Sequence, residues 1–310
     1  MFRRITTLTC AATVAGAAFV GLAAGTANAV PGCPDVHWIG AAGSGERVGT
    51  DLTAYSGMGR VVYQSLTELS TELQKDGRSL TAEAVDYPAV PVPDDDGGVG
   101  AWLGFMGSVD TGATALGKQY EDFVQQCPTS KVVLAGYSQG AMVVHRNLQA
   151  LAASPNLAAV LLVADGDRRP DDPTLNLGTV SGLPKHGKGV AQDWPILAHA
   201  PAVLPADIGA KTISVCDVGD AVCDPDPDSD SDSVSARAVA VHTSYARTPG
   251  LEWTAPLYFL LGPAPTAPQG PLPGPDARAI TSTTAPAGSN SAASTATMAS
   301  TAPAADIPAS

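Results

Sequence analysis

The stretch that decides the fold is residues 131–153, which read KVVLAGYSQGAMVVHRNLQALAA. Its first five residues form an apolar run that predicts a buried strand, and residues 141–153 have the pattern of a helix. Between them, residues 136–140 match Gly-x-Ser-x-Gly, which in this setting forms a sharp turn that presents a serine hydroxyl above a sheet. We therefore predict that Ser138 is a nucleophile rather than an incidental serine in a glycine-rich turn.

The residues around Ser138 suit such a turn, because strand and helix nearly touch there. Gly136, Gly140 and Ala141 provide the small side chains that this close approach needs. The turn places the hydroxyl at the positive end of the helix dipole. The backbone N–H of Gln139 would then point at a developing oxyanion, so we assign Gln139 to an oxyanion hole.

Outward from this stretch, strand-like and helix-like segments alternate along the chain. The predicted strands are residues 36–41, 80–85, 131–135, 158–163 and 211–216, and the predicted helices are residues 56–75, 111–126, 141–153 and 253–261. Such alternation predicts a mostly parallel sheet, and strands without polar alternation fit burial on both faces. We therefore predict an α/β fold, a three-layer α/β/α sandwich around a central, mostly parallel sheet.

Both ends of the chain differ in composition from this segment. Two arginines precede an apolar run, and residues 27–29 (Ala-Asn-Ala) form a small-x-small pattern of the kind that signal peptidase recognises. Residues 262–310 are almost entirely Ala, Pro, Ser, Thr and Gly, a composition that does not bury enough apolar surface to fold. We predict a signal peptide at 1–29, one folded domain at 30–261 and a disordered tail at 262–310.

The charge of the chain excludes one class of partner. The formal net charge is −13 at pH 7, and it becomes −15 without the predicted signal peptide, because two arginines and no acidic residue leave with it. So acidic a protein repels phosphates, and we expect no nucleic-acid partner. No stretch after the signal peptide approaches the ~20 apolar residues that a transmembrane helix needs. The oligomeric state is left open.

The cysteines indicate an exported protein. One of the five cysteines lies in the predicted signal peptide, and those that remain are Cys33, Cys127, Cys216 and Cys223. An even number in an exported chain predicts two disulfides, for which four cysteines allow three pairings. We therefore expect a secreted protein, with association to the cell wall or to a lipid surface left open.

An acid and a base that would activate Ser138 follow it in the chain, because enzymes with this turn have the order serine, acid, histidine. Residues 216–223 read CDVGDAVC, begin at the end of a predicted strand and carry Asp220 between two cysteines. A small disulfide ring would hold this acid rigidly enough to orient an imidazole. Since His242 is the only histidine after Asp220, we predict a triad of Ser138, His242 and Asp220.

Other histidines and acids remain as alternatives. They are His37, His145, His186 and His199, and Asp165, Asp167, Asp217 and Asp224. His37 lies in the first predicted strand and His145 points away from the serine on the following helix, and the order serine, acid, histidine excludes both. His186 and His199 become candidates only if an acid after the fourth strand, Asp165 or Asp167, takes the place of Asp220.

Together these segments resemble the cutinase family, including the cutinase-like esterases of actinobacteria. The matching pieces are Gly-Tyr-Ser-Gln-Gly at 136–140, Cys-x-x-x-Asp-x-x-Cys at 216–223, His-x-x-Tyr at 242–245, Gly43-Ser44 after the first strand, and the places of Cys33 and Cys127. They occur in order within residues 33–261. The resemblance implies a compact α/β-hydrolase fold and a serine carboxylic-ester hydrolase that works through an acyl-enzyme.

The resemblance also implies pairings and roles that the residues alone leave open. It implies disulfides Cys33–Cys127 and Cys216–Cys223. It further implies a second oxyanion donor at Ser44, a role that its glycine neighbours support by letting the loop approach closely. Such an enzyme takes an ester or lipid substrate and needs no metal and no organic cofactor.

The chain departs from the family pattern in three places. Ala42 stands where related enzymes often have Arg, which affects the support of the loop that follows. Residues 90–108 are longer than a compact member needs. Residues 224–233 add a run of Asp, Pro and Ser and lengthen the span from Asp220 to His242 to 22 residues. We interpret this run as a solvated loop, with calcium binding as the alternative, although it lacks the glycine and terminal Glu of an EF-hand loop.

Two further questions stay open at this level. Residues 102–106, with Trp102, Leu103, Phe105 and Met106, either line an acyl-binding cleft or pack in the core, and the same holds for residues 194–197. The triad also fits an acyltransferase or thioesterase that acts on cell-envelope lipids. A wall-associated binding protein whose triad geometry has decayed is the third alternative.

Overall fold

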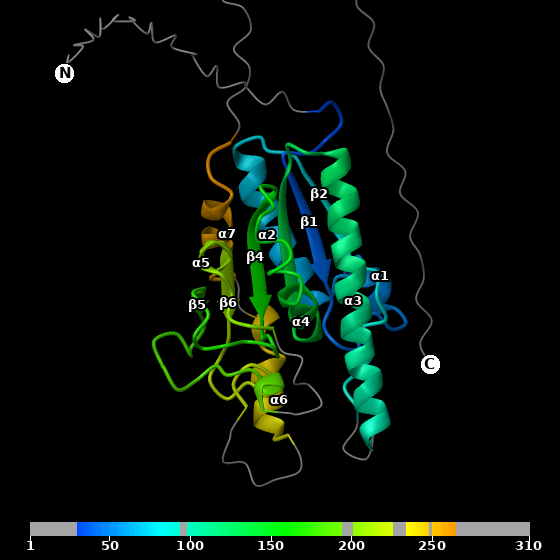
Figure 1. Cartoon of the computed structure of the whole chain (residues 1–310), viewed down its shortest axis with the longest axis vertical. Coiled ribbons are helices and arrows are strands. Elements are labelled where there is room, and N and C mark those ends of the chain that lie inside the picture. Colours follow the sequence, from blue (N-terminus) through cyan, green and yellow to red (C-terminus); the bar gives the residue numbers. More distant parts are fainter. Residues whose placement is uncertain (1–29, 94–97, 194–200, 226–233, 248–249, 265–310) are drawn as a thin grey trace, which may run out of the picture. The chain divides into compact units, whose positions relative to one another are not determined.

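The computed structural model describes residues 30–93, 98–193, 201–225, 234–247 and 250–264 (Figure 1). Within these residues, six strands form one sheet in the order β2-β1-β3-β4-β6-β5, and every strand pair is parallel. The strands are β1 Val36–Ala41, β2 Leu80–Ala84, β3 Lys131–Tyr137, β4 Leu157–Val163, β5 Leu175–Leu177 and β6 Thr212–Val215. The predicted α/β fold with a central parallel sheet is confirmed.

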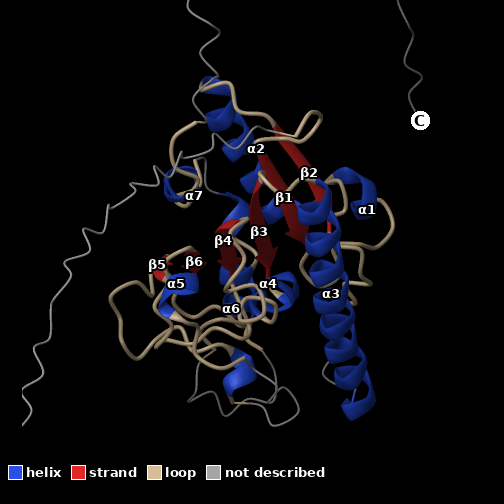
Figure 2. Cartoon of the chain, turned by 45° about the horizontal axis from the view of Figure 1, so that its top comes forward, coloured by secondary structure: helices blue, strands red, loops and turns tan. Residues whose placement is uncertain are grey.

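Helices cover both faces of the sheet (Figure 2). They are α1 Asp51–Ala54, α2 Arg60–Lys75, α3 Gly98–Gln126, α4 Gln139–His145, α5 Ala206–Gly209, α6 Ala236–His242 and α7 Thr254–Leu260, with short 3-10 turns at Val190–Gln192 and Tyr245–Arg247. One buried cluster joins the sheet to α3 and α4, and a second joins the other face to α2 and α7. The three layers of the predicted sandwich are therefore helices, sheet and helices.

The central strands explain why two cores form. In β3, Val132 and Leu134 belong to the cluster under α3 and α4, whereas Val133 and Ala135 belong to the cluster under α2 and α7. All four side chains are fully buried. A strand that is apolar at every position has this pattern when both of its faces are covered by helices.

The helix boundaries differ from the sequence prediction most at the start of α3 and at the end of α4, and α2 begins at Arg60 instead of residue 56. Helix α3 begins at Gly98 instead of residue 111, although four of its first ten residues are glycines, which disfavour helices. Burial of Phe105, Met106 and Val109 on this stretch offsets that low propensity. The amino-terminal end of α3 extends past the carboxyl ends of the strands (Figure 1).

Helix α4 ends at His145 instead of residue 153. The N–H groups of Asn147 and Leu148 bond to carbonyls three residues back, and the Asn147 side chain donates to the Val143 carbonyl at 3.0 Å. Turns of this tighter kind replace the α-helical ladder. Strand β5 was missed by the sequence prediction, because three residues are too few to show a period.

The last helix is tied to the sheet by two cations. Lys131 donates to the carbonyl of Leu261, and Arg78 donates to the carbonyl of Gly262 at 2.9 Å. Positive side chains at these positions satisfy carbonyls that a helix end leaves open and interact well with its dipole. The predicted signal peptide, and nearly all of the predicted tail, lie outside the described residues.

The fold has two disulfides, with the pairings that the family resemblance implies. Cys33 pairs with Cys127, which joins the segment before β1 to the residue after α3, and Cys216 pairs with Cys223. In the described part of the chain, no helix is long and apolar enough to cross a membrane.

We expect the double variant Cys33→Ser/Cys127→Ser to lose about 2–5 kcal/mol of unfolding free energy, because this bond closes a long loop of 94 residues in sequence separation. Urea unfolding followed by circular dichroism measures the change. Val48→Ser, at an exposed position, is a control that we expect to stay within about 0.5 kcal/mol of the wild type. Equal midpoints and slopes for the double variant and the wild type would contradict the prediction.

Candidate active site

Ser138 lies at the turn between β3 and α4 in a backbone conformation that side chains rarely adopt. Its φ is 54° and its ψ is −120°, and it is the N-cap residue of α4. The turn leaves no room for side chains, since a Cβ on Gly136 would lie 2.2 Å from the Gly140 carbonyl oxygen. A strained non-glycine residue held by such tight packing is a common feature of functional sites.

His242 and Asp220 are placed next to this serine. His242 is the last residue of α6, and its Nε2 lies 3.0 Å from the Ser138 Oγ. Its Nδ1 lies 3.0 Å and 3.1 Å from the two carboxylate oxygens of Asp220. The structure thus brings the three predicted triad residues into one hydrogen-bonded series, although 22 residues separate Asp220 from His242 in the sequence.

Asp220 is fully buried inside the loop that the Cys216–Cys223 disulfide closes. Its Oδ1 also accepts the N–H groups of Val222 at 2.7 Å and of Cys223 at 3.0 Å. Burial acts to raise its pKa, but the hydrogen bond and charge of His242 and these two N–H groups outweigh burial and hold the pKa below its ordinary value. The carboxylate is therefore kept ionised beside the imidazole.

Two tyrosines support the hydrogen-bonded series of Ser138, His242 and Asp220, and the sequence predicted a role for neither. The Tyr245 hydroxyl donates to the Asp220 Oδ2 at 2.9 Å and accepts the Asp217 N–H at 2.9 Å. The Tyr137 hydroxyl donates to the His242 carbonyl at 2.7 Å, and its ring stacks on the imidazole with centroids 5.1 Å apart. Tyr137 lies within the motif at 136–140 and Tyr245 within the motif at 242–245, and these positions were the only indication of their roles in the sequence.

The two predicted oxyanion donors are backbone N–H groups from separate parts of the chain. Gln139 is the first residue of α4, and Ser44 lies in the loop after β1. Among the described residues, neither N–H has a protein acceptor. The Gln139 side chain is buried and donates weakly to the Val90 carbonyl at 3.4 Å, so it is held back toward the loop before α3.

The alternative histidines in the described part of the chain have other partners. His37 contacts Thr81 and Glu83, and His145 contacts Asp165 at 2.6 Å through its Nδ1. His186 contacts Asp224 at 3.1 Å. His199 lies outside the described residues.

The alternative acids are likewise engaged away from Ser138. Asp167 pairs with Arg146 at 2.8 Å, and Asp217 accepts the Thr179 N–H at 2.9 Å. The histidine and acid that the structure places at Ser138 are therefore His242 and Asp220.

The apolar cluster at residues 102–106 was expected either to line an acyl-binding cleft or to pack in the core, and its residues differ in this respect. Phe105 and Met106 are buried in the core under α3, and Trp102 is partly buried against that core. Leu103 is 59% exposed. Core packing therefore accounts for Phe105 and Met106, whereas Leu103 faces solvent. The second apolar stretch, residues 194–197, lies outside the described residues.

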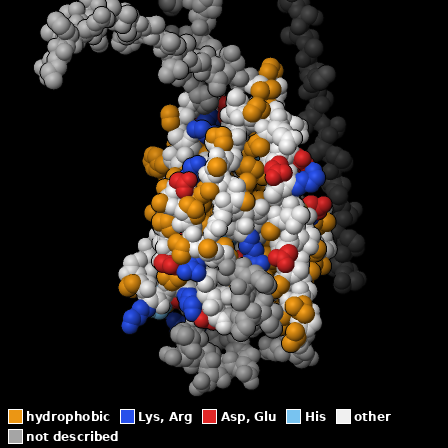
Figure 3. All heavy atoms as spheres, in the orientation of Figure 1, with side chains coloured by type: hydrophobic (Ala, Val, Ile, Leu, Met, Phe, Trp, Pro, Cys, Tyr) orange, Lys and Arg blue, Asp and Glu red, His pale blue; other side chains and the backbone are white. Residues whose placement is uncertain are grey.

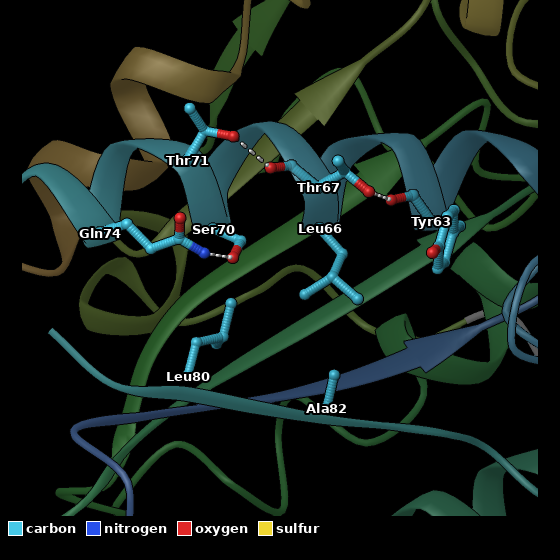
Figure 4. A pocket seen from close by; sticks show the side chains of 8 residues that line it. All are labelled: Tyr63, Leu66, Thr67, Ser70, Thr71, Gln74, Leu80 and Ala82. Atoms are coloured by element: carbon cyan, nitrogen blue, oxygen red, sulfur yellow. Dashed lines mark hydrogen bonds between the residues drawn. The ribbon is translucent and has the colours of Figure 1, made fainter. Parts of the chain in front are cut away.

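A groove of about 310 Å³ between α2 and β2 is not part of this site (Figure 4). Leu66 points from α2 toward Leu80 and Ala82 on the edge strand. The hydroxyls of Thr67 and Thr71 are already bonded to carbonyls one turn back in α2. Leu80 begins β2, so the groove lies toward the amino end of the sheet, whereas Ser138 follows the carboxyl end of β3.

Across the residues that the structure describes, no group of three or more His, Cys, Asp or Glu side chains is arranged to hold a metal ion. Of the acidic run considered for calcium, residues 226–233 lie outside the described residues.

A family model described as Cutinase matches residues 32–253 of the chain. The chain is 27% identical to "Cutinase CUT1" of Coprinopsis cinerea over 191 residues, which is 62% of this chain and 71% of that protein. It is 27% identical to "Phospholipase Culp4" of Mycobacterium tuberculosis over 221 residues, 71% of this chain and 80% of that protein. The solved structure of a cutinase-like protein from Cryptococcus sp. covers 74% of this chain and 96% of that one, with a TM-score of 0.51 at 20% identity, and shows the same fold.

We expect Tyr245→Phe to lower kcat/KM about tenfold, because Asp220 loses a donor and the loop loses the bond from the Asp217 N–H. Hydrolysis of a p-nitrophenyl ester measures this. Tyr258→Phe is the matched control, because its hydroxyl also donates to a carboxylate, Asp76, but at the exposed surface. A Tyr245→Phe enzyme as active as the control would contradict the prediction.

We expect acid to remove the stability that ionised Asp220 provides. Because its pKa in the folded state lies below the ordinary value of 3.8, this contribution is present above that value and is lost as pH falls through the folded pKa. The free energy of unfolding should therefore fall more steeply between about pH 5 and pH 2 in the wild type than in Asp220→Asn. Urea titrations at stepped pH test this, and parallel curves would speak against it.

Proposed function

The chain belongs to the cutinase family, and from that premise we propose that it hydrolyses carboxylic esters through an acyl-enzyme formed on Ser138. The family membership makes it a carboxylic ester hydrolase. The observation that supports the triad mechanism is the hydrogen-bonded chain of Ser138, His242 and Asp220, with contacts of 3.0 Å on both sides of the imidazole. These distances are within the reach that a general base requires.

Acylation begins when the Ser138 Oγ attacks the ester carbonyl carbon. The His242 Nε2 takes the hydroxyl proton as the bond forms, and ionised Asp220 stabilises the imidazolium and keeps its Nδ1 protonated. The carbonyl oxygen becomes an oxyanion, which the N–H groups of Gln139 and Ser44 receive. Collapse of this intermediate breaks the ester C–O bond, and the alcohol leaves with the proton from Nε2.

Deacylation repeats these steps with water as the nucleophile. His242 takes a proton from water, whose oxygen attacks the acyl carbon, and the second tetrahedral intermediate uses the same two N–H donors. When it collapses, the Ser138 oxygen recovers the proton and the carboxylic acid is released. His242 returns each proton that it takes within the same half-reaction. Both half-reactions use only side chains, backbone N–H groups and water, so the proposed mechanism needs no cofactor.

The substrate that fits best is an ester with an apolar part, such as a lipid or polyester. Hydrophobic side chains gather at the amino-terminal end of α3 (Figure 3), where Val99 and Leu103 are exposed. This end of the helix projects beyond the carboxyl ends of the strands, which is also the end of the sheet where Ser138 follows β3. Exposed apolar surface beside a reacting centre favours contact with an apolar substrate.

Export belongs to the same proposal. Two disulfides stabilise proteins in oxidising compartments, and they follow an amino terminus with the pattern of a signal peptide. We place the enzyme outside the cell, with residues 30–261 as its folded domain and residues 262–310 as a tail that extends from it.

An acyltransferase or thioesterase with the same triad is the main competing function. It would differ in the group that accepts the acyl chain from Ser138. A decayed binding protein fits poorly, because the described geometry keeps both contacts of the imidazole. Adding an acceptor alcohol and measuring the transesterified product beside the free acid separates hydrolysis from transfer.

We expect Ser138→Ala to lower kcat at least about 10⁴-fold on p-nitrophenyl esters of short to long chain length, because the nucleophile is lost. An organophosphate should label Ser138 once per molecule, as mass spectrometry of the peptide would show. Ser181→Ala, an exposed serine, is the control that should keep full activity. Full esterase activity in Ser138→Ala would refute the mechanism.

A further inference from the structure

We propose that Glu46 is a positioning residue that holds the oxyanion loop, residues 42–46, in its working conformation. This role rests on the proposed ester hydrolysis, since it acts on the second oxyanion donor. In this role, the carboxylate holds the N–H of Gly43 by a hydrogen bond. The fixed backbone at Gly43 then directs the N–H of the next residue, Ser44, toward the space beside Ser138. Nothing in the sequence motifs singles out Glu46 for this purpose.

The carboxylate of Glu46 joins two elements that are separated along the chain. Its Oε2 accepts the Gly43 N–H at 2.7 Å, and its Oε1 accepts the N–H of Arg60 at 2.9 Å. Arg60 is the first residue of α2, whose N-cap, Gly59, offers no side chain to that end of the helix. One partly buried carboxylate thus ties the loop after β1 to the start of a sixteen-residue helix.

From Gly43 to Glu46, every backbone N–H except that of Ser44 is occupied, which leaves Ser44 as the available donor of these four residues. The Gly43 N–H binds Glu46, the Gly45 N–H donates to the Ala89 carbonyl at 2.7 Å, and the Glu46 N–H donates to the Gly43 carbonyl at 3.2 Å. Among the described residues, only the Ser44 N–H of this set lacks an acceptor. Glu46 therefore determines which donor the loop presents.

Neighbouring glycines make the room that this carboxylate occupies. A Cβ on Gly59 would lie 2.0 Å from the Glu46 Oε2, and a Cβ on Gly43 would lie 2.9 Å from the same oxygen. Gly59 also has a φ of +77°, which favours glycine. The packing around the carboxylate is thus too close for another side chain, and the oxygens have little freedom to move.

The loop also packs against Tyr137, the residue that stacks on the proposed catalytic base. A Cβ on Gly43 would meet the Tyr137 ring at 2.7 Å, and that ring stacks on His242. A displacement of Gly43 therefore changes the surroundings of the imidazole as well as the direction of the Ser44 N–H.

The electrostatics fit a carboxylate that is costly to bury and is kept for its hydrogen bonds. Burial raises the pKa of Glu46, the N–H groups of Arg60 and Gly43 lower it, the charge of Asp51 raises it and His242 lowers it, with a net rise. A carboxylate accepts from two donors at once, whereas a neutral carboxamide has a single acceptor oxygen. If this carboxylate served only the stability of the fold, an apolar side chain of similar volume would stabilise the protein as well.

The test compares Glu46→Gln with the wild type. Glu46→Gln keeps the size of the side chain but turns an NH₂ group toward the N–H of either Gly43 or Arg60. One of these two hydrogen bonds is then lost, and the loop must shift. Because oxyanion contacts strengthen in the transition state, we expect kcat to fall about tenfold to hundredfold while KM stays within about twofold. Rates are measured on a p-nitrophenyl ester and divided by the enzyme concentration that a phosphonate titrates at Ser138.

Two further variants separate positioning from general stability. Glu46→Ala removes both acceptors and should lower kcat at least as much, provided that circular dichroism shows it folded. Glu68→Gln is the matched control, because Glu68 on α2 also accepts a backbone N–H, that of Leu251, and the Thr254 hydroxyl, but it contacts none of the triad residues. We expect Glu68→Gln to keep the wild-type kcat even where it lowers the melting temperature.

A fall in kcat at constant KM in Glu46→Gln, with normal kcat in Glu68→Gln, supports the proposal. A Glu46→Gln enzyme with the wild-type kcat per titrated site overturns it, and so does an equal fall in Glu68→Gln, which would indicate a general loosening of α2. Absence of ester turnover in the wild type, or full turnover in Ser138→Ala, would instead remove the proposed function itself, and this result is distinct from a failure of Glu46 alone.

Discussion

The arrangement of this site depends on how closely α4 approaches the strands that precede it. A Cβ on Gly140 would lie 2.2 Å from the carbonyl oxygen of Ala41 and 2.5 Å from that of Ala42. The same approach that forces Ser138 to a positive φ therefore brings the loop after β1 against the first turn of α4. Through this backbone contact, the loop that contains Ser44, a proposed oxyanion donor, is brought against the helix that begins with the other proposed donor, Gln139.

The base reaches the nucleophile in a different way. Helix α6 has no buried side chain, so core packing does not fix the position of His242. Instead, Tyr137 contacts both its carbonyl and its ring, and Asp220 contacts its Nδ1. Asp220 in turn is held by the disulfide ring and by Tyr245. The site thus combines a rigid nucleophile on the sheet with a base that is positioned by side-chain contacts, and the added chain between acid and base changes neither contact.

Local patterns in the sequence predicted what depends on local packing. Apolar runs predicted the five longer strands, and the strand-turn-helix context of residues 136–140 predicted the position of Ser138. The amino-terminal half of α3 was missed because its glycines disfavour a helix unless tertiary burial of Phe105 and Met106 is known. The roles of Tyr137 and Tyr245 were missed for the same physical reason, since each depends on contacts with residues far away in the chain.

Comparison of Glu46 with Asp220 shows why the role of Glu46 needs coordinates. Asp220 is fully buried and Glu46 is partly buried, both interact with the charge of the same imidazole, and burial alone would raise the pKa of each. Asp220 gathers two N–H groups, a hydroxyl and the imidazole, and its pKa is lowered. Glu46 has two N–H groups and no direct cation, and its pKa stays raised. The number and charge of the donors therefore separate an acid suited to face a developing imidazolium from one suited to hold a backbone loop. The sequence singles out Asp220 by its place between two cysteines, but nothing comparable marks Glu46.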